Sequence, residues 1–226
     1  MQAVEATIAA ATEAAGRPRA SVQLLAVSKT FPMEAVLEAM AAGQRAFGEN
    51  YLQEGVEKIA AVARAQPDTP VEWHFIGPIQ SNKTRPIATS FAWVHTVERL
   101  KIAQRLSEQR PPEMGPLNVC LQVNISGETT KSGATPSELP ELARQVAALP
   151  NLKLRGLMAI PEAQADPALQ RAAFAKLRVL ADALRAGGLA IDTLSMGMSG
   201  DMASAIAEGA TIVRVGSAIF GARNYD

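Results

Sequence analysis

The stretch Leu24-Leu25-Ala26-Val27-Ser28-Lys29-Thr30 sets a pattern that the rest of the chain repeats. Its apolar residues predict a buried strand over residues 22–28, after which Phe31-Pro32 turns the chain into a helical segment. Lys29 therefore lies at the carboxyl end of a strand, where ligands collect in sheets with helical crossovers. A desolvated amine there can lose its proton and form a Schiff base with a carbonyl compound. The alternative is that Lys29 only marks the exit of the strand into solvent, as exposed lysines commonly do.

Further apolar segments follow, and apolar residues at helical spacing separate them, notably over 52–63, 139–149 and 169–184. Thr135-Pro136-Ser137-Glu138 predicts a capping box with proline at the first helical position, and Asp166-Pro167 predicts a cap followed by proline. This alternation favours an α/β fold, a (β/α)8 TIM barrel preceded by an extra N-terminal helix. A doubly wound open sheet is the alternative, disfavoured because no Gly-x-Gly-x-x-Gly follows the first strand. The predicted strands are 22–28, 44–47, 71–76, 92–95, 118–123, 154–158, 193–195 and 211–215.

Length and composition limit the class of protein. A chain of 226 residues matches the ~200 to 250 that an α/β barrel uses as one domain, so we expect a single domain over 1–226. Basic and acidic residues balance at 22 each, which makes nucleic acid and membrane surfaces poor partners. No apolar run approaches the ~18 residues of a spanning helix, and the N-terminus lacks the pattern of a leader. Cys120, the only cysteine, excludes an internal disulfide and reads as core filling. We expect a cytoplasmic monomer.

The last forty residues or so carry a second set of candidates. Ser199 precedes a predicted helix over 202–208 and is expected to be its N-cap, so that its hydroxyl and the first backbone N–H groups converge on one point. Such a point binds anions. The next strand runs directly into Gly216 and Ser217, where a short helical turn can begin, and barrels commonly hold phosphate at this place. The alternative is that both are ordinary turns, in which glycine and serine are frequent.

Arg214 lies inside the last predicted strand. Arginine is almost never fully buried without a partner, so this guanidinium is expected to pair with a core carboxylate or to contact a ligand. A lysine at a strand end, a phosphate site and an arginine on a neighbouring strand describe a pocket for a phosphorylated aldehyde. Pyridoxal 5′-phosphate (PLP) fits that description.

Motifs through nearly the whole chain, in order, closely resemble those of the pyridoxal phosphate homeostasis protein family. They are AVSKT (26–30), FGENYLQE (47–54), WHFIGPIQSNK (73–83), QVNI (122–125), TKSG (130–133), GLM (156–158) and LSMGMSGD (194–201). The chain departs from many relatives at Phe31, where they place a second basic residue, so a role of that residue in cofactor transfer does not carry over.

The resemblance implies the barrel of the alanine racemase N-terminal domain, with PLP held as an internal aldimine. In this reading Lys29 forms the aldimine, Arg214 faces the pyridine nitrogen and Asn50 lies near the cofactor ring, while no residue is assigned as catalytic and no metal is expected. The cofactor-binding residues that the resemblance implies are Lys29, Asn50, Ser199, Arg214, Gly216 and Ser217.

Two features argue against strong catalysis. An arginine that donates to the ring nitrogen leaves it unprotonated, which makes the ring a weaker electron sink than a pyridinium paired with a carboxylate. The sequence also ends just after the barrel, without the second domain whose tyrosine serves the resembling racemases, and racemisation needs proton donors on both faces. We therefore expect a PLP carrier or regulator in vitamin B6 homeostasis, with PLP-requiring apoenzymes as possible recipients. The rivals are a PLP-dependent amino-acid racemase, and a cofactor-free aldolase in which Lys29 attacks a sugar phosphate held by Ser199 and Gly216.

Other titratable residues are expected to be structural. His74 and His95 lie in predicted strands and are read as hydrogen-bonded core histidines rather than acid/base groups. Two histidines and one cysteine without ligand spacing argue against structural zinc. Lys131 follows a predicted strand and is a secondary candidate for binding cofactor or anion, the alternative being a surface lysine. The remaining charged candidates are read as solvated or rim charges: Glu49 with Glu54, and Lys83 with Arg85.

Overall fold

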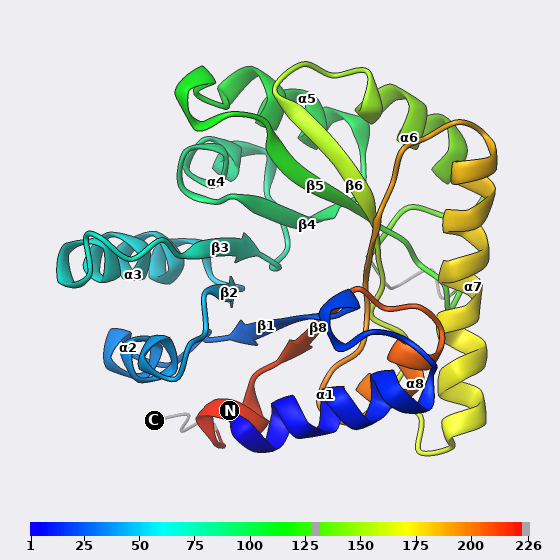
Figure 1. The fold of residues 1–226 in the computed structure, drawn as a ribbon. Coiled ribbons are helices and arrows are strands. Elements are labelled where there is room, and N and C mark those ends of the chain that lie inside the picture. The colour runs from blue at the N-terminus through cyan, green and yellow to red at the C-terminus, as the bar shows by residue number, and fades with distance from the viewer. Residues whose placement is uncertain (128–131, 223–226) are drawn as a thin grey trace.

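A computed structural model describes residues 1–127 and 132–222. In this part of the chain eight parallel strands close into a barrel in sequence order, β1 to β8, and Figure 1 shows helices along its outside. The predicted (β/α)8 barrel is confirmed, and it excludes the open doubly wound sheet. The strands are β1 (Gln23–Val27), β2 (Ala46–Glu49), β3 (Glu72–Phe75), β4 (Trp93–Val97), β5 (Leu117–Gln122), β6 (Leu152–Met158), β7 (Thr193–Ser195) and β8 (Ile212–Val215).

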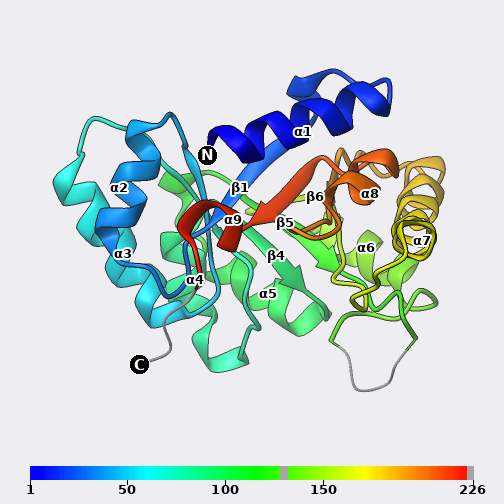
Figure 2. The same cartoon turned by 90° about the horizontal axis from the view of Figure 1, so that it is seen from below.

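The expected N-terminal helix is present as α1, which lies against α8 at one side of the barrel (Figure 2). Arg17, just after α1, donates from Nη1 to the carbonyl of Ile206 at 2.7 Å and so ties α1 to α8. Short 3-10 segments span Arg19–Ser21, Ser81–Lys83 and Pro112–Met114. The helices are α1 (Gln2–Ala14), α2 (Met33–Ala41), α3 (Leu52–Ala65), α4 (Thr84–Ser90), α5 (Leu100–Gln109), α6 (Leu139–Ala147), α7 (Pro167–Ala186), α8 (Met202–Ala207) and α9 (Ser217–Phe220).

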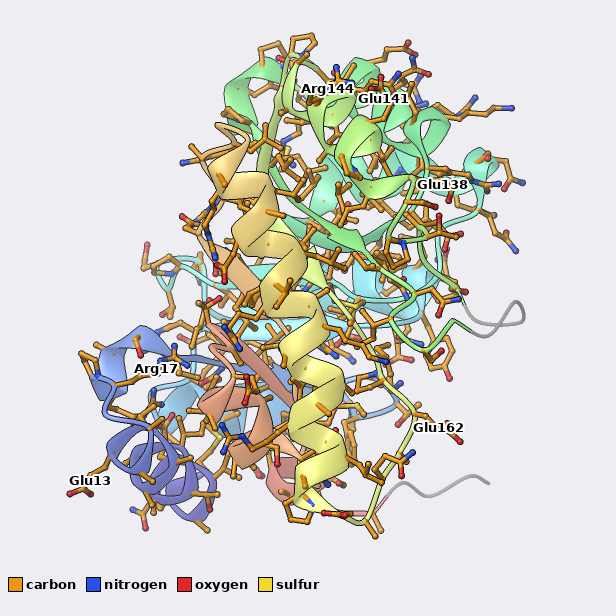
Figure 3. All side chains as sticks on the ribbon, turned by 90° about the vertical axis from the view of Figure 1, so that its right-hand side faces the viewer. Glu13, Arg17, Glu138, Glu141, Arg144 and Glu162 are labelled. Atoms are coloured by element: carbon orange, nitrogen blue, oxygen red, sulfur yellow. The ribbon has the colours of Figure 1, made fainter. Side chains whose placement is uncertain are left out.

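Local sequence signals explain where α6 and α7 begin. Asp166 caps α7 by accepting a hydrogen bond from the backbone of Ala168 at 2.8 Å, with proline at the first helical position, as predicted. The capping box before α6 also forms, since Thr135 and Glu138 exchange backbone-to-side-chain hydrogen bonds at 3.1 and 3.3 Å. The α-helix itself, however, starts at Leu139 and not at the proline of the box. Figure 3 labels Glu138, the residue just before α6, and shows the long helix α7 on the same side of the molecule.

The core has two layers because side chains alternate across each strand. The larger cluster packs the outward faces of the strands against the helices, and the smaller fills the barrel interior. Cys120 belongs to the interior cluster and is fully buried, as expected of core filling. Burial raises the pKa of its thiol to about 12. The buried members of the interior cluster are Leu25, Ala46, Trp93, Cys120, Met158 and Ile212.

Candidate functional site

Lys29 follows β1 at the carboxyl end of the barrel, as the sequence predicts, and it is partly buried. It occupies the second position of a β-turn that the Phe31 N–H closes on the carbonyl of Ser28 at 3.1 Å. Thr30, the third residue of this turn, has a φ of 68°, in the left-handed region that non-glycine residues seldom adopt. The turn therefore holds the Lys29 backbone at a defined place on the rim of the barrel.

The carboxyl end of β8 lies directly beside this turn. Strands β1 and β8 pair in parallel, with Leu25 opposite Arg214 and Ala26 opposite Val215. A Cβ atom at Gly216 would lie 3.1 Å from the carbonyl oxygen of Val27, so the two strand ends approach closely. Closure of the barrel thus brings a residue near the start of the chain next to one near its end.

The short helix α9 completes this contact. The Phe220 ring on α9 lies 5.2 Å from the ring of Phe31, which fixes the helix against the lysine turn. The first backbone N–H groups of a helix have no intrahelical acceptor. Within residues 1–127 and 132–222, no group accepts from the backbone N–H of Gly216, Ser217 or Ala218. The structure thus places Gly216 and Ser217 beside Lys29, with backbone donors available to an anion.

The expectation that Ser199 caps α8 is wrong. The N-cap residue is Asp201, whose carboxylate accepts a hydrogen bond from the backbone N–H of Met198 at 2.6 Å. This bond closes a short turn ahead of the helix, which leaves Ser199 exposed within the turn. Ser199 still follows β7, the strand beside β8, and the backbone N–H of Arg214 donates to Gly197 at 2.9 Å to fix that register. Ser199 therefore lies on the same rim as Gly216, but without a capping role.

Arg214 points into the barrel and is 95% buried, with 5% of its surface exposed. Its guanidinium donates from Nη1 to the Ser195 hydroxyl at 2.7 Å and from Nη2 to the Ala159 carbonyl at 3.1 Å. A core carboxylate, one of the two partners expected from the sequence, is not among its hydrogen-bond acceptors in the described residues. Burial lowers the pKa of Arg214 to about 10, so the group stays cationic at neutral pH. The other three of its five N–H donors have no acceptor among the described residues.

A continuous row of hydrogen bonds leads from Arg214 across the barrel. The Ser195 hydroxyl lies 2.7 Å from His95 Nδ1, His95 Nε2 lies 2.8 Å from His74 Nδ1, and His74 Nε2 lies 2.9 Å from a carboxylate oxygen of Glu72. Both histidines are fully buried, as expected of core residues. Glu72 is the first residue of β3, at the opposite end of the barrel from Lys29, and its side chain is 41% exposed.

The ionised carboxylate of Glu72 and the neutral state of both imidazoles fix the direction of every hydrogen bond between Glu72 and Ser195. Arginine only donates and an ionised carboxylate only accepts. His74 therefore donates from Nε2 to Glu72. Because both imidazoles are neutral, His74 Nδ1 accepts from His95 Nε2 and His95 Nδ1 accepts from the Ser195 hydroxyl, so each ring carries its proton on Nε2. Burial, the main cause, lowers the pKa of His74 and moves that of His95 well below its ordinary value. The hydrogen bond from His74 lowers the pKa of Glu72 to about 2, which keeps the acceptor end ionised.

Glu49 does not lie at the rim, contrary to expectation. It is fully buried between β2 and α3, where its Oε1 accepts from Lys58 Nζ at 2.8 Å and from the Ser28 hydroxyl at 2.6 Å. Burial raises the pKa of Glu49, and Lys58 opposes this shift. Glu54 is partly exposed and also contacts Lys58. The buried ion pair with Lys58 was not predicted from the sequence, because the spacing of apolar residues along α3 does not distinguish Lys58 from the other charged residues of that helix.

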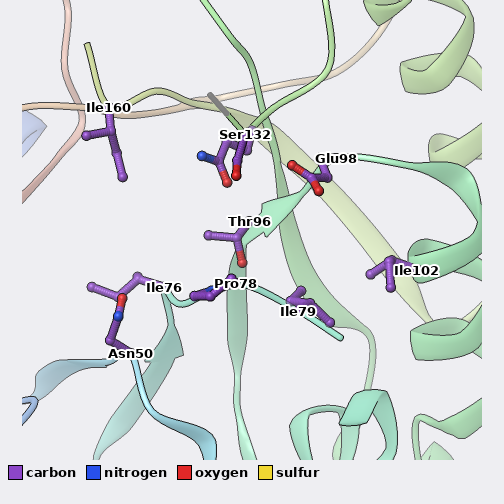
Figure 4. Close-up of a pocket in the computed structure, with 10 residues that line it drawn as sticks. Asn50, Ile76, Pro78, Ile79, Thr96, Glu98, Ile102, Ser132 and Ile160 are labelled. Carbon is purple, nitrogen blue, oxygen red and sulfur yellow. The ribbon is translucent and has the colours of Figure 1, made fainter. Parts of the chain in front are cut away.

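Asn50 follows β2 and lines a cavity of about 280 Å³ at the mouth of the barrel, together with Thr96, Glu98 and Gln122 (Figure 4). It also lines a neighbouring cavity of about 470 Å³ that reaches Lys83 between α3 and α4. Open space therefore adjoins the strand ends on the side of β2 to β6, across the mouth from α9.

The remaining candidates contribute little to this site. Lys83 and Arg85 are exposed, as expected of solvated charges, and Lys131 lies outside the described residues. In the described ranges no three His, Cys, Asp or Glu side chains come together in a group able to hold a metal ion. No helix there is long and apolar enough to span a membrane.

Comparison with known proteins agrees with this geometry. The model of the alanine racemase N-terminal domain family matches residues 1–224. The chain is 64% identical to the pyridoxal phosphate homeostasis protein of Pseudomonas aeruginosa over 222 residues, which is 98% of this chain and 94% of the relative. It is 54% identical to the protein of that name from Escherichia coli K12 over 218 residues, 96% of this chain and 93% of the relative.

A solved structure adds the ligand of a relative. PipY from Synechococcus elongatus, solved with PLP bound, superposes with a TM-score of 0.81 at 38% identity, over 95% of this chain and all of that one. The barrel, the motifs and these relatives agree, and the chain belongs to the pyridoxal phosphate homeostasis protein family, built on the alanine racemase N-terminal domain.

Proposed function

We propose that this protein binds PLP covalently through the Lys29 amine and works in PLP homeostasis as a carrier, with little catalytic activity of its own. The observation that carries the proposal is the close approach of Gly216, the N-cap of α9, to Val27, two residues before Lys29, with the Arg214 guanidinium buried in the adjoining strand. A bound PLP supplies an aldehyde for an amine, a phosphate for the helix start and a ring nitrogen for the arginine. PipY, at 38% identity, is a relative solved with PLP bound.

Different residues at the rim are assigned to different parts of PLP according to their chemistry. We assign the phosphate to the backbone donors and hydroxyl at Gly216 and Ser217, since helix starts favour anions. Ser199, on the turn after β7, adds a hydroxyl from the other side. The amide of Asn50 lines the open mouth and is assigned to the cofactor ring.

Arg214 supports a carrier more than an enzyme. As a permanent cation it donates and cannot accept, so a ring nitrogen in contact with it stays unprotonated. A ring of that kind withdraws electrons weakly, which disfavours racemisation and transamination. The row of hydrogen bonds that runs through Ser195 and His95 to Glu72 fixes the guanidinium on its side facing the barrel interior. Three further properties are predictions: transfer of PLP to apoenzymes that need it, a cytoplasmic location and a monomeric state.

Reduction with borohydride followed by mass spectrometry tests the covalent assignment. We expect one pyridoxyl group per chain on Lys29, and none in Lys29→Ala. Lys83→Ala, which removes an exposed lysine elsewhere on the rim, is the matched control and should label fully. Full labelling of Lys29→Ala at another lysine would refute the assignment.

A transfer assay tests the carrier role. Protein loaded with PLP should restore activity to a PLP-requiring apoenzyme, while showing no amino-acid turnover near the ~10 per second typical of enzymes. Rapid turnover with any amino acid would favour the racemase reading. A protein that is colourless after purification and binds no added PLP would favour the aldolase reading.

A further inference from the structure

The turn that carries Lys29 adopts a conformation that its own sequence does not favour. Ser28 and Phe31 close a four-residue turn, and Thr30 takes the third position with a φ of 68°. Turns with positive φ at this position favour glycine or asparagine, and a β-branched residue there is a marked exception. Contacts from outside the turn must therefore stabilise it.

Two charged side chains of α3 supply those contacts. Glu54 Oε1 accepts the backbone N–H of Thr30 at 2.7 Å, and Lys58 Nζ donates to the backbone carbonyl of Ser28 at 2.8 Å. The two contacted peptide groups lie on either side of Lys29. Hydrogen bonds to charged groups are about twice as strong as those between neutral groups, so both contacts are of the stronger kind.

The surroundings of Lys58 hold these contacts rigidly. Its three ammonium protons are matched by three acceptors, each at 2.8 Å: the Ser28 carbonyl, Glu49 Oε1 and Glu54 Oε1. Lys58 and Glu49 are buried, with side chains 4% and 0% exposed. Glu49 also accepts from the Ser28 hydroxyl, so β2, α3 and the turn meet in one network.

We propose that Glu54 and Lys58 are positioning residues that hold Thr30 in its left-handed conformation and thereby aim the Lys29 amine at the cofactor. This inference rests on the proposed function in one respect, namely that Lys29 is the reacting amine. The alternative is that the same contacts only dock α3 on the barrel, with no effect on the lysine.

The test uses Glu54→Gln, because Glu54 is partly exposed and its replacement leaves Lys58 paired with Glu49. In the full chain freed of cofactor, the rate of covalent PLP capture is followed by absorbance. We expect Glu54→Gln to slow capture on the order of tenfold, because the neutral amide oxygen accepts the Thr30 N–H more weakly than the carboxylate does and small errors in aim are costly to reaction rates. Glu57→Gln, an exposed glutamate one turn along the same helix, is the matched control and should leave the rate unchanged.

Thr30→Gly supplies the decisive comparison. Glycine adopts the left-handed conformation without assistance, so adding Glu54→Gln to Thr30→Gly should slow capture less than threefold. If contacts to α3 only dock the helix, Glu54→Gln lowers the melting temperature equally in both backgrounds and leaves the capture rate unaffected. That result would overturn the proposal, as would an equal loss of rate in both backgrounds.

A second readout needs no cofactor. Amide hydrogen exchange at Thr30, measured by NMR in the protein without PLP, should accelerate at least tenfold in Glu54→Gln and remain slow in Glu57→Gln. Unchanged protection at Thr30 would overturn the role of Glu54. If the unmodified chain fails to capture PLP, the proposed function is refuted. If Thr30 protection is lost only in Glu54→Gln in that case, the inference that Glu54 holds the turn is still supported.

Discussion

Ser195→Ala should be among the most damaging conservative substitutions in the barrel. The hydroxyl joins Arg214 to His95 through two bonds of 2.7 Å, and all three residues are at least 95% buried. Its removal leaves a guanidinium N–H without an acceptor and an imidazole nitrogen without a donor. Each unsatisfied buried group costs about 1 to 3 kcal/mol, and charged groups cost more. We expect a loss of about 3 kcal/mol in the free energy of unfolding.

For a chain of this size that loss means a fall of roughly 6 to 12 °C in melting temperature, measured by calorimetry on the protein without cofactor. Ser204→Ala is the control, because that buried hydroxyl makes a single neutral bond to Gln170 at 2.7 Å and should lose only about 1 kcal/mol. NMR of the unmodified protein should find both histidines with the proton on Nε2. The reasoning fails if Ser195→Ala is no less stable than Ser204→Ala, or if either imidazole is charged at neutral pH.

Three further predictions concern pH, packing and affinity. Burial lowers the pKa of His74, so the unfolded chain binds a proton more readily than the folded protein, and the free energy of unfolding should fall as pH drops below 6.5. The pKa of Glu72 is also lowered, so a second loss of stability should run from pH 4.5 toward 2. Urea unfolding followed against pH measures both losses, and the second should vanish in Glu72→Gln. Gly156→Ala should unfold or severely destabilise the barrel, because its Cβ would lie 1.8 Å from the backbone oxygen of Thr193, whereas Gly200→Ala meets nothing within 4 Å and should be tolerated in thermal melts. Ser199→Ala should weaken PLP binding by roughly 1 to 2 kcal/mol in equilibrium titrations and leave pyridoxal binding unchanged, and equal weakening for both ligands would count against a phosphate contact.

The order of the elements was predictable because each strand and helix leaves its own local signal. Strand β7 was predicted at its observed bounds, and α7 starts at the predicted aspartate and proline. Strand β2 was misplaced, because the Gln44 side chain binds the carbonyls of Leu24 and Ala46 and the strand begins only after it. A polar side chain that binds backbone carbonyls at the start of a strand can thus shift a strand boundary that the apolar pattern alone does not locate.

The connections within the site were beyond local signals. Ser199 and Asp201 both suit an N-cap, and the choice depends on a turn that only tertiary structure shows. Charge alone placed Glu49 at the rim, whereas its position on the outward face of β2 puts it beneath α3. His95 and Ser195 lie on β4 and β7, which face each other only after the barrel closes, so no pattern along the chain could pair them.

The contact between Phe31 and Phe220 has a consequence for synthesis of the protein. Lys29 follows the first strand, and the proposed phosphate donors at Gly216 and Ser217 follow the last, so the two halves of the proposed site meet where the barrel closes. A nascent chain that has not yet released β8 from the ribosome has the amine but lacks Arg214 and the start of α9. Binding of PLP at the proposed site can therefore stabilise only chains in which β8 has been synthesised and paired with β1, so loading with PLP reports closure of the barrel.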